Sequence, residues 1–359
     1  MAADSMKIFE RYVGIDYSGA ETPTASLKGL RVFVAEGELM PVEVLPKSGL
    51  RKYWTRKDIA NWLIDLLTAD VPTLVGIDHA FSFPLRYFEA HQIEPDWSVF
   101  LDDFQRHWPT DEDNTYVDFV RNGSVGDGEA RKGDARWRRL TEQRTGGAKS
   151  VFHFDVPGSV AKSSHAGIPW LRTIRQRLDG LVHFWPFDGW DVATGRSVIA
   201  EVYPSLWSSG WAREDRTADQ HDAFCVAAWM QRVDCDETLR THLTPDLAPH
   251  ERTVARAEGW ILGVGGHGSA CRGSKLRRSK SSLRKTGRRK PSKRTTEPGY
   301  INKNGQAVLL RTSIAGNDHN QFVYVLRCAA CQHEYGANGS DIWQRKCPEC
   351  GGGAPGLGY

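Results

Sequence analysis

Four cysteines near its end constrain the fold of this 359-residue chain more than any other feature. They form two Cys-x2-Cys pairs separated by fifteen residues, Cys328 with Cys331 and Cys347 with Cys350. This spacing is typical of a zinc site, because each pair forms a tight turn that directs two thiolates at one ion. Four reactive or disulfide-bonded cysteines are the alternative, which the spacing disfavours. Because four thiolates complete the coordination of Zn²⁺, the sequence predicts a structural zinc ribbon over residues 298–359.

Composition divides the chain into three segments. Residues 1–263 hold nearly all the tryptophan and the hydrophobic periodicity, so we expect one folded domain there, with a helical insertion at about residues 87–149. Residues 264–297 are rich in Gly, Ser, Lys and Arg and have no apolar period. Such a segment buries too little apolar surface to fold alone, which predicts a basic, disordered linker before the zinc ribbon.

Positive charge is concentrated in this linker. Between Arg272 and Arg294 there are 12 Lys and Arg residues and no acidic residue, whereas the rest of the chain has 35 basic and 44 acidic residues. The segregation favours a nucleic-acid partner, DNA or RNA, held through its phosphates, since few aromatic residues are interleaved for base stacking. A solvated linker without a partner is the alternative. The candidate phosphate-binding residues are Arg277, Arg278, Arg284, Lys285, Arg288, Arg289 and Lys290.

Hydrophobic patterns in residues 1–263 predict an α/β domain with five strands. The strands are expected at residues 11–17, 30–36, 39–45, 73–78 and 197–203. Flanking helices are expected at residues 56–69, 168–178 and 219–233.

Carboxylates mark the ends of these elements. Asp16 ends the first strand in GIDYSG, Asp78 ends the fourth in GIDHAFSFP, and Glu201 lies in the fifth. Asp219 and Asp222 are three residues apart, which places them on one face near the start of the last helix. Each residue alone could cap a turn or a helix. Together they are candidate catalytic groups for two-metal phosphodiester hydrolysis, because Mg²⁺ or Mn²⁺ binds carboxylate oxygens.

The order of elements is that of ribonuclease H with an insertion after the fourth strand. GIDYSGA, GIDHAFSFP, KSVFHFDVPGSVAKSSHAGIPWL, EVYPSLW and DQHDAFCVAAW resemble a widespread family of uncharacterised proteins predicted to be ribonuclease H-fold nucleases, over about residues 10–263. The Asp-x2-Asp pair is also similar to that of bacterial Holliday-junction resolvases. The resemblance implies a mixed five-stranded sheet and metal-ligand roles for Asp16, Asp78, Asp219 and Asp222. The resolvases have Glu where Asp78 stands.

The segment GSVAKSSHAGIPWL contains further candidates for contacting phosphate. Gly158, Lys162, Ser163 and His165 could form a phosphate-binding loop before the helix at 168–178. A packed connector with Ser164 as a helix cap is an equally good interpretation.

The sequence therefore predicts a metal-dependent nuclease or phosphodiesterase. One alternative is a non-catalytic adapter that binds nucleic acid and keeps the acidic cluster for structure. Another is a nucleotide-binding protein like actin or the sugar kinases, but GIDHAFSFP lacks the phosphate-loop glycine and only one such half is visible. No apolar run reaches the roughly 20 residues that span a bilayer, and the first ten residues lack the apolar stretch of a signal peptide. We therefore expect a cytoplasmic protein without a membrane partner.

Overall fold

The structure is a computed structural model of the chain. It describes residues 7–47, 51–156, 158–265, 295–316 and 322–359. The chain divides into two compact units, one on each side of residues 266–294. The expected basic linker therefore falls largely outside the described residues, and so do its candidate phosphate-binding residues Arg277, Arg278, Arg284, Lys285, Arg288, Arg289 and Lys290.

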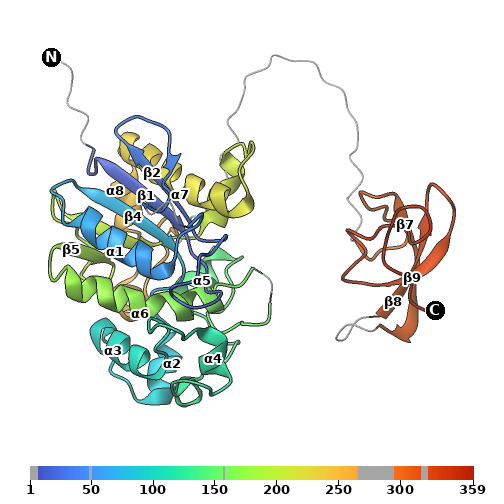
Figure 1. Ribbon diagram of the computed structural model, residues 1–359, viewed down its shortest axis with the longest axis horizontal. Coiled ribbons are helices and arrows are strands. Elements are labelled where there is room, and N and C mark those ends of the chain that lie inside the picture. Colours follow the sequence, from blue (N-terminus) through green and yellow to red (C-terminus); the bar gives the residue numbers. More distant parts are fainter. Residues whose placement is uncertain (1–6, 48–50, 157, 266–294, 317–321) are drawn as a thin grey trace. The chain divides into compact units, whose positions relative to one another are not determined.

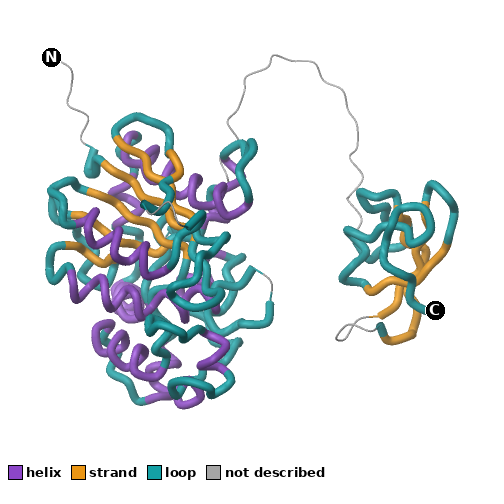
Figure 2. Tube along the Cα trace, in the orientation of Figure 1, coloured by secondary structure: helices purple, strands orange, loops and turns teal. Residues whose placement is uncertain are grey.

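A central sheet organises the first unit (Figures 1 and 2). Its six strands are β1 (Arg11–Asp16), β2 (Arg31–Glu36), β3 (Val42–Glu43), β4 (Thr73–Asp78), β5 (Val182–Trp185) and β6 (Ser197–Glu201). They lie in the order β3-β2-β1-β4-β6-β5. β2 is antiparallel to both of its neighbours, β1 and β3, whereas β4, β6 and β5 run parallel to β1. The first unit is thus a mixed α/β structure.

The sheet has one strand more than the sequence predicts. The extra strand, β5, lies at the edge and has only four residues, all buried. Hydrophobicity alone does not separate it from the preceding helix, since only a short turn with Gly180 at φ +68° lies between them. At the other edge, the strand expected over residues 39–45 is reduced to β3, where Val42 is exposed.

Helices cover both faces of the sheet. Alternate residues of β1 and β4 point to opposite sides, as they must in an extended chain. Val13 and Val75 contact the apolar core that contains α1 (Arg56–Leu67) and α6 (Ala161–Arg177). Tyr12 and Leu74 contact the core of α7 (Ala218–Cys235) on the other face. The remaining α-helices of this unit are α2 (Leu85–His91), α3 (Trp97–His107), α4 (Val117–Arg121), α5 (Leu140–Thr145), α8 (Leu239–Leu243) and α9 (Pro249–Glu258).

Two glycines let α7 lie directly on the sheet. A Cβ at Gly14 in β1 would come within 2.1 Å of the Ala223 carbonyl oxygen of α7. A Cβ at Gly76 in β4 would come within 2.8 Å of the Val226 side chain. The glycine in each GID tripeptide is therefore required for close helix–sheet packing, and it places the following aspartate beside α7.

Replacing Gly14 by Ala should destabilise the first unit by about 1–3 kcal/mol, because the methyl group collides with backbone that cannot rotate away. Urea unfolding followed by circular dichroism measures this change in stability. Gly210→Ala is the matched control, since a Cβ there meets nothing within 4 Å. Equal stability of the two variants would contradict the close-packing role.

The second unit contains a three-stranded antiparallel sheet. Its strands are β7 (Gln306–Ala315), β8 (Phe322–Cys328) and β9 (Glu334–Asn338), in that order across the sheet. Ahead of β7 the chain reverses at Asn304-Gly305, where Gly305 has φ +73° and Ile301 bridges Ala307. An Asn-Gly pair is typical of such a hairpin turn.

None of the helices in the described part of the chain is long and apolar enough to cross a membrane.

Candidate functional site

The four cysteines of the second unit come together as the sequence predicts. The sulfur atoms of Cys328, Cys331, Cys347 and Cys350 all lie within 4.8 Å of one another. The Cys328–Cys350 and Cys331–Cys347 sulfur pairs are 3.6 and 3.5 Å apart. Four sulfurs at 2.3 Å from a tetrahedral Zn²⁺ would be about 3.8 Å apart. The cluster therefore has the donor set and the spacing of a zinc site.

The local structure explains this convergence. Cys328 ends β8 and Cys331 follows in a tight turn, in which the Gln332 amide donates to the Cys328 carbonyl. Hydrogen bonding, chiefly from the Cys331 backbone amide, lowers the pKa of Cys328 to about 6. Hydrogen bonds shared with the other three sulfurs raise the pKa of Cys350 to about 12. A bound cation would offset this crowding of thiols and thiolates.

In the first unit, Asp16 and Asp78 lie side by side. They are register partners at the ends of the parallel strands β1 and β4. Neighbouring strands are about 4.8 Å apart, and equal register puts both side chains on the same face. Gly14 and Gly76, two residues earlier, face α7, so both carboxylates point to the α7 side. Both residues are partly buried and remain accessible to solvent.

The start of α7 brings two more carboxylates to this place. Thr217 caps the helix by accepting from the Gln220 amide, so Asp219 is not the helix cap. A Cβ at Gly29 would lie 3.7 Å from both Asp219 Oδ2 and Ser18 Oγ, which places Asp219 beside the loop that follows Asp16. Asp222 is one turn further along the same face.

The four aspartates interact electrostatically. Burial raises the pKa of Asp16 well above its ordinary value, and the charges of Asp78, Asp219 and Asp222 raise it further, while Arg31 lowers it. Burial, followed by the charges of Asp222 and Glu201, raises the pKa of Asp78. Burial and Asp219 also raise the pKa of Asp222. Carboxylates that repel one another in this way favour a proton or a cation between them.

The aspartates nevertheless do not form a finished single-ion site. Among the described residues, the cysteines form the one group of three or more potential ligands whose donor atoms all lie within 4.8 Å of one another. Asp16, Asp78 and Asp222 therefore influence one another's pKa without forming such a group. The predicted Mg²⁺ or Mn²⁺ thus remains a prediction.

Glu201, which the sequence places among the candidate catalytic groups, is buried and paired with another side chain. Its side chain is 3% exposed and forms a two-pronged ion pair with Arg139, at 2.7 and 2.5 Å. It also accepts a hydrogen bond from the Phe81 amide. Asp16 and Asp78 face α7, but Glu201 alternates with Ala200, which belongs to the α7 core, and so points to the other side. Its direct contacts therefore support a structural role.

Of the four residues expected to form a phosphate-binding loop, Gly158 precedes α6 and the other three lie within it. Lys162, Ser163 and His165 belong to the first turns of α6, which begins seven residues before the predicted helix. His165 is 1% exposed, and burial among aromatic rings such as Phe83 and Trp108 lowers its pKa to about 3. Lys162 forms an ion pair with Asp118 at 2.6 Å. The packed connector is the better interpretation, although Ser164 lies inside the helix and accepts from the Ala80 amide instead of capping it.

A small cavity of about 20 Å³ adjoins Asp78. Its polar walls also contain the Arg139 ion pairs with Glu142 and Glu201, together with Lys149 and Tyr203. Lys149 and Tyr203 lie in two of the motif segments, but the sequence assigns neither a role, and Arg139 lies outside those segments.

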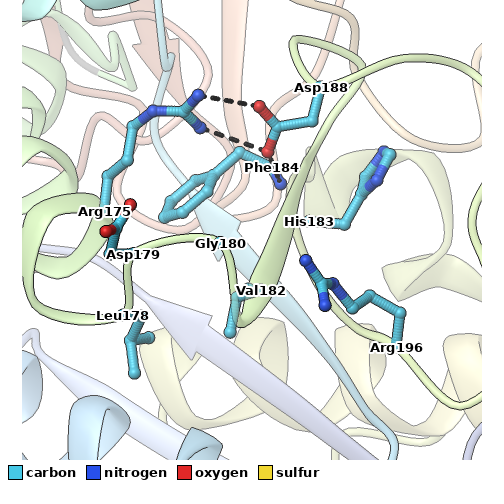
Figure 3. A pocket seen from close by; sticks show the side chains of 9 residues that line it. All are labelled: Arg175, Leu178, Asp179, Gly180, Val182, His183, Phe184, Asp188 and Arg196. Atoms are coloured by element: carbon cyan, nitrogen blue, oxygen red, sulfur yellow. Dashed lines mark hydrogen bonds and ion pairs between the residues drawn. The ribbon is translucent and has the colours of Figure 1, made fainter.

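A larger cavity of about 270 Å³ lies away from these carboxylates, beside β5 (Figure 3). Arg175 binds Asp188 with two hydrogen bonds of 2.8 and 3.1 Å, and Arg196 points toward the cavity from the opposite side. The Arg175 guanidinium also lies over the Trp97 ring. The charge of Arg175 thus stabilises the packing of α6 against the edge strand β5. The residues that line this larger cavity include no group of carboxylates comparable to the four aspartates.

Comparison of the chain with family models, curated proteins and solved structures found no match.

Proposed function

We propose that residues 7–265 form a ribonuclease H-like, metal-dependent nuclease or phosphodiesterase. The observation that carries the proposal is the register pairing of Asp16 with Asp78 at the ends of two parallel strands, beside the start of α7. Adjacent strands and one helix start thereby supply four carboxylates from three separate segments. Such convergence of charge is costly unless a cation is bound, which favours a functional site over an incidental one.

The proposed roles follow from position. Asp16, Asp78 and Asp222 would hold Mg²⁺ or Mn²⁺, and Asp219 lies close enough to adjust their charge. Two ions about 3.5–4 Å apart need a broader ligand set than one ion, which suits carboxylates that are neighbours without converging on a single point. When bound, the ions would activate water and stabilise the leaving oxygen.

A panel of labelled DNA and RNA substrates, single-stranded, duplex and branched, tests the proposal in Mg²⁺ and in Mn²⁺. We expect cleavage of at least one substrate by the wild-type chain and none by Asp16→Asn. Binding without cleavage at any metal concentration would instead support the adapter hypothesis. ATP binding without nucleic-acid binding would support the actin-like alternative.

Nucleic acid is the proposed partner of the basic segment as well. Deleting residues 273–294 should weaken binding similarly for all sequences, because contacts to phosphates do not distinguish bases. It should also flatten the dependence of binding on salt, by roughly 0.9 in log–log slope for each phosphate of duplex DNA that the segment neutralises. Fluorescence anisotropy over a range of salt concentrations measures both effects. An unchanged slope would mean that this segment is only a linker.

A further inference from the structure

We propose that Lys149 and Tyr203 form a phosphate-binding subsite next to Asp78, which receives an oxygen of a nucleic-acid backbone phosphate. This inference rests on the proposed nuclease function and identifies where its substrate phosphate is held. It begins from the small cavity, which Asp78, Lys149 and Tyr203 line together.

Both polar groups lie beside glycines of the segment between α5 and α6. A Cβ at Gly147 would lie 3.5 Å from the Tyr203 hydroxyl. A Cβ at Gly158 would lie 3.8 Å from Lys149 Nζ, and Gly158 has φ +70°, which other residues rarely adopt. Lys149 thus comes from the residues that follow α5, and Tyr203 from the residues that follow β6.

The two cations that line the cavity differ in burial. Arg139 is 1% exposed, and its guanidinium is bound to Glu142 at 2.8 Å and to Glu201 at 2.5 Å. These three buried groups form a closed network with their charges directed at one another. Lys149 is only partly buried. Its ammonium has three N–H donors, so it can add a charge-assisted hydrogen bond to an anion at the Asp78 site while it keeps its contacts within the fold.

The size of the cavity indicates which part of a nucleic acid enters it. A water-sized group needs about 10–15 Å³ of such space, so 20 Å³ admits one oxygen and excludes a base. A backbone phosphate presents its non-bridging oxygens singly and carries no sequence information. The subsite is therefore suited to a phosphate of any nucleotide sequence.

Calorimetric titration with inorganic phosphate in the presence of Mg²⁺ tests the subsite directly in the full chain. We expect Lys149→Gln to weaken phosphate binding about tenfold, as expected when one charge-assisted hydrogen bond is removed. Tyr203→Phe should weaken it less. Lys132→Gln is the matched control, because Lys132 is exposed and pairs with Glu129. Circular dichroism of each variant verifies folding.

The subsite proposal would be overturned if the wild-type chain did not bind phosphate, or if Lys149→Gln bound it as tightly as the wild-type chain. Steady-state cleavage separates this failure from failure of the nuclease proposal. If the wild-type chain cleaves nucleic acid and Lys149→Gln has the same KM and kcat, the function stands and the subsite is wrong. If Lys149→Gln loses phosphate binding but the wild-type chain cleaves no substrate, the subsite stands and the nuclease proposal is wrong.

Discussion

Replacing both Cys347 and Cys350 by Ser should remove zinc from the protein and unfold the second unit while the first stays folded. Cys328 and Cys347 are themselves part of the apolar core of this unit, together with Val308, Leu326, Tyr335, Ala337 and Ile342. A core this small gives little independent stability. Structural zinc contributes on the order of 10 kcal/mol in comparable modules, more than the rest of the unit can replace.

Elemental analysis of the wild-type chain, purified without chelator, should find one zinc per chain, and the double variant should have none. Limited proteolysis should then cleave residues 295–359 of the variant and spare residues 7–265. Cys235→Ser is the matched control, since Cys235 is an exposed cysteine of the first unit. A zinc-free wild-type chain, or a double variant that keeps its zinc, would contradict the assignment.

The parts of the structure that the sequence predicts well are those determined by local pattern. GID at the end of an apolar run defines a strand whose last residue is a carboxylate, and parallel pairing then brings Asp16 and Asp78 together. Helical periodicity does the same for Asp219 and Asp222. The cysteine spacing alone predicts that the two sulfurs of each pair lie close together, because each Cys-x2-Cys pair forms a single tight turn.

What could not be predicted depends on contacts between distant residues. Arg139 neutralises Glu201 from 62 residues earlier in the chain, and no periodic pattern links the two. The start of α6 looks like a polar loop in sequence, yet its polar side chains find partners within the fold. Ser164 accepts from the Ala80 amide, and His165 Nδ1 contacts the Ala161 carbonyl oxygen at 2.9 Å. Burial of such residues is decided by the helical insertion packed around them.

Asp78→Asn should abolish metal-dependent cleavage and stabilise the first unit at neutral pH in the absence of divalent metal. Both effects come from removing the negative charge of Asp78. Burial and the charges of Asp222 and Glu201 raise the pKa of Asp78 in the folded state, so keeping this carboxylate ionised opposes folding. The amide has nearly the same shape without the charge, but it is a poorer ligand for Mg²⁺.

The dependence on pH follows from the direction of that pKa shift. Near pH 4, around the unfolded pKa of about 3.9, Asp78 can remain protonated in the folded protein and the variant gains little. As the pH rises toward the raised folded pKa, the unfolded state ionises first, the wild-type chain loses stability, and its difference from Asp78→Asn grows. Melting temperatures measured from pH 4 to pH 8 should therefore diverge, by roughly 2–4 °C for each kcal/mol.

Divalent metal should reverse the difference. Mg²⁺ or Mn²⁺ binds the folded wild-type site and raises its melting temperature by mass action, whereas Asp78→Asn should respond weakly. Asp70→Asn is the matched control, because Asp70 is exposed in the turn before β4 and lies outside the cluster. Parallel melting curves for the wild-type chain and Asp78→Asn at every pH would show that the cluster has no electrostatic cost. Cleavage by Asp78→Asn at the wild-type rate would remove this carboxylate from the catalytic site, since removal of a metal ligand must reduce metal affinity or activity.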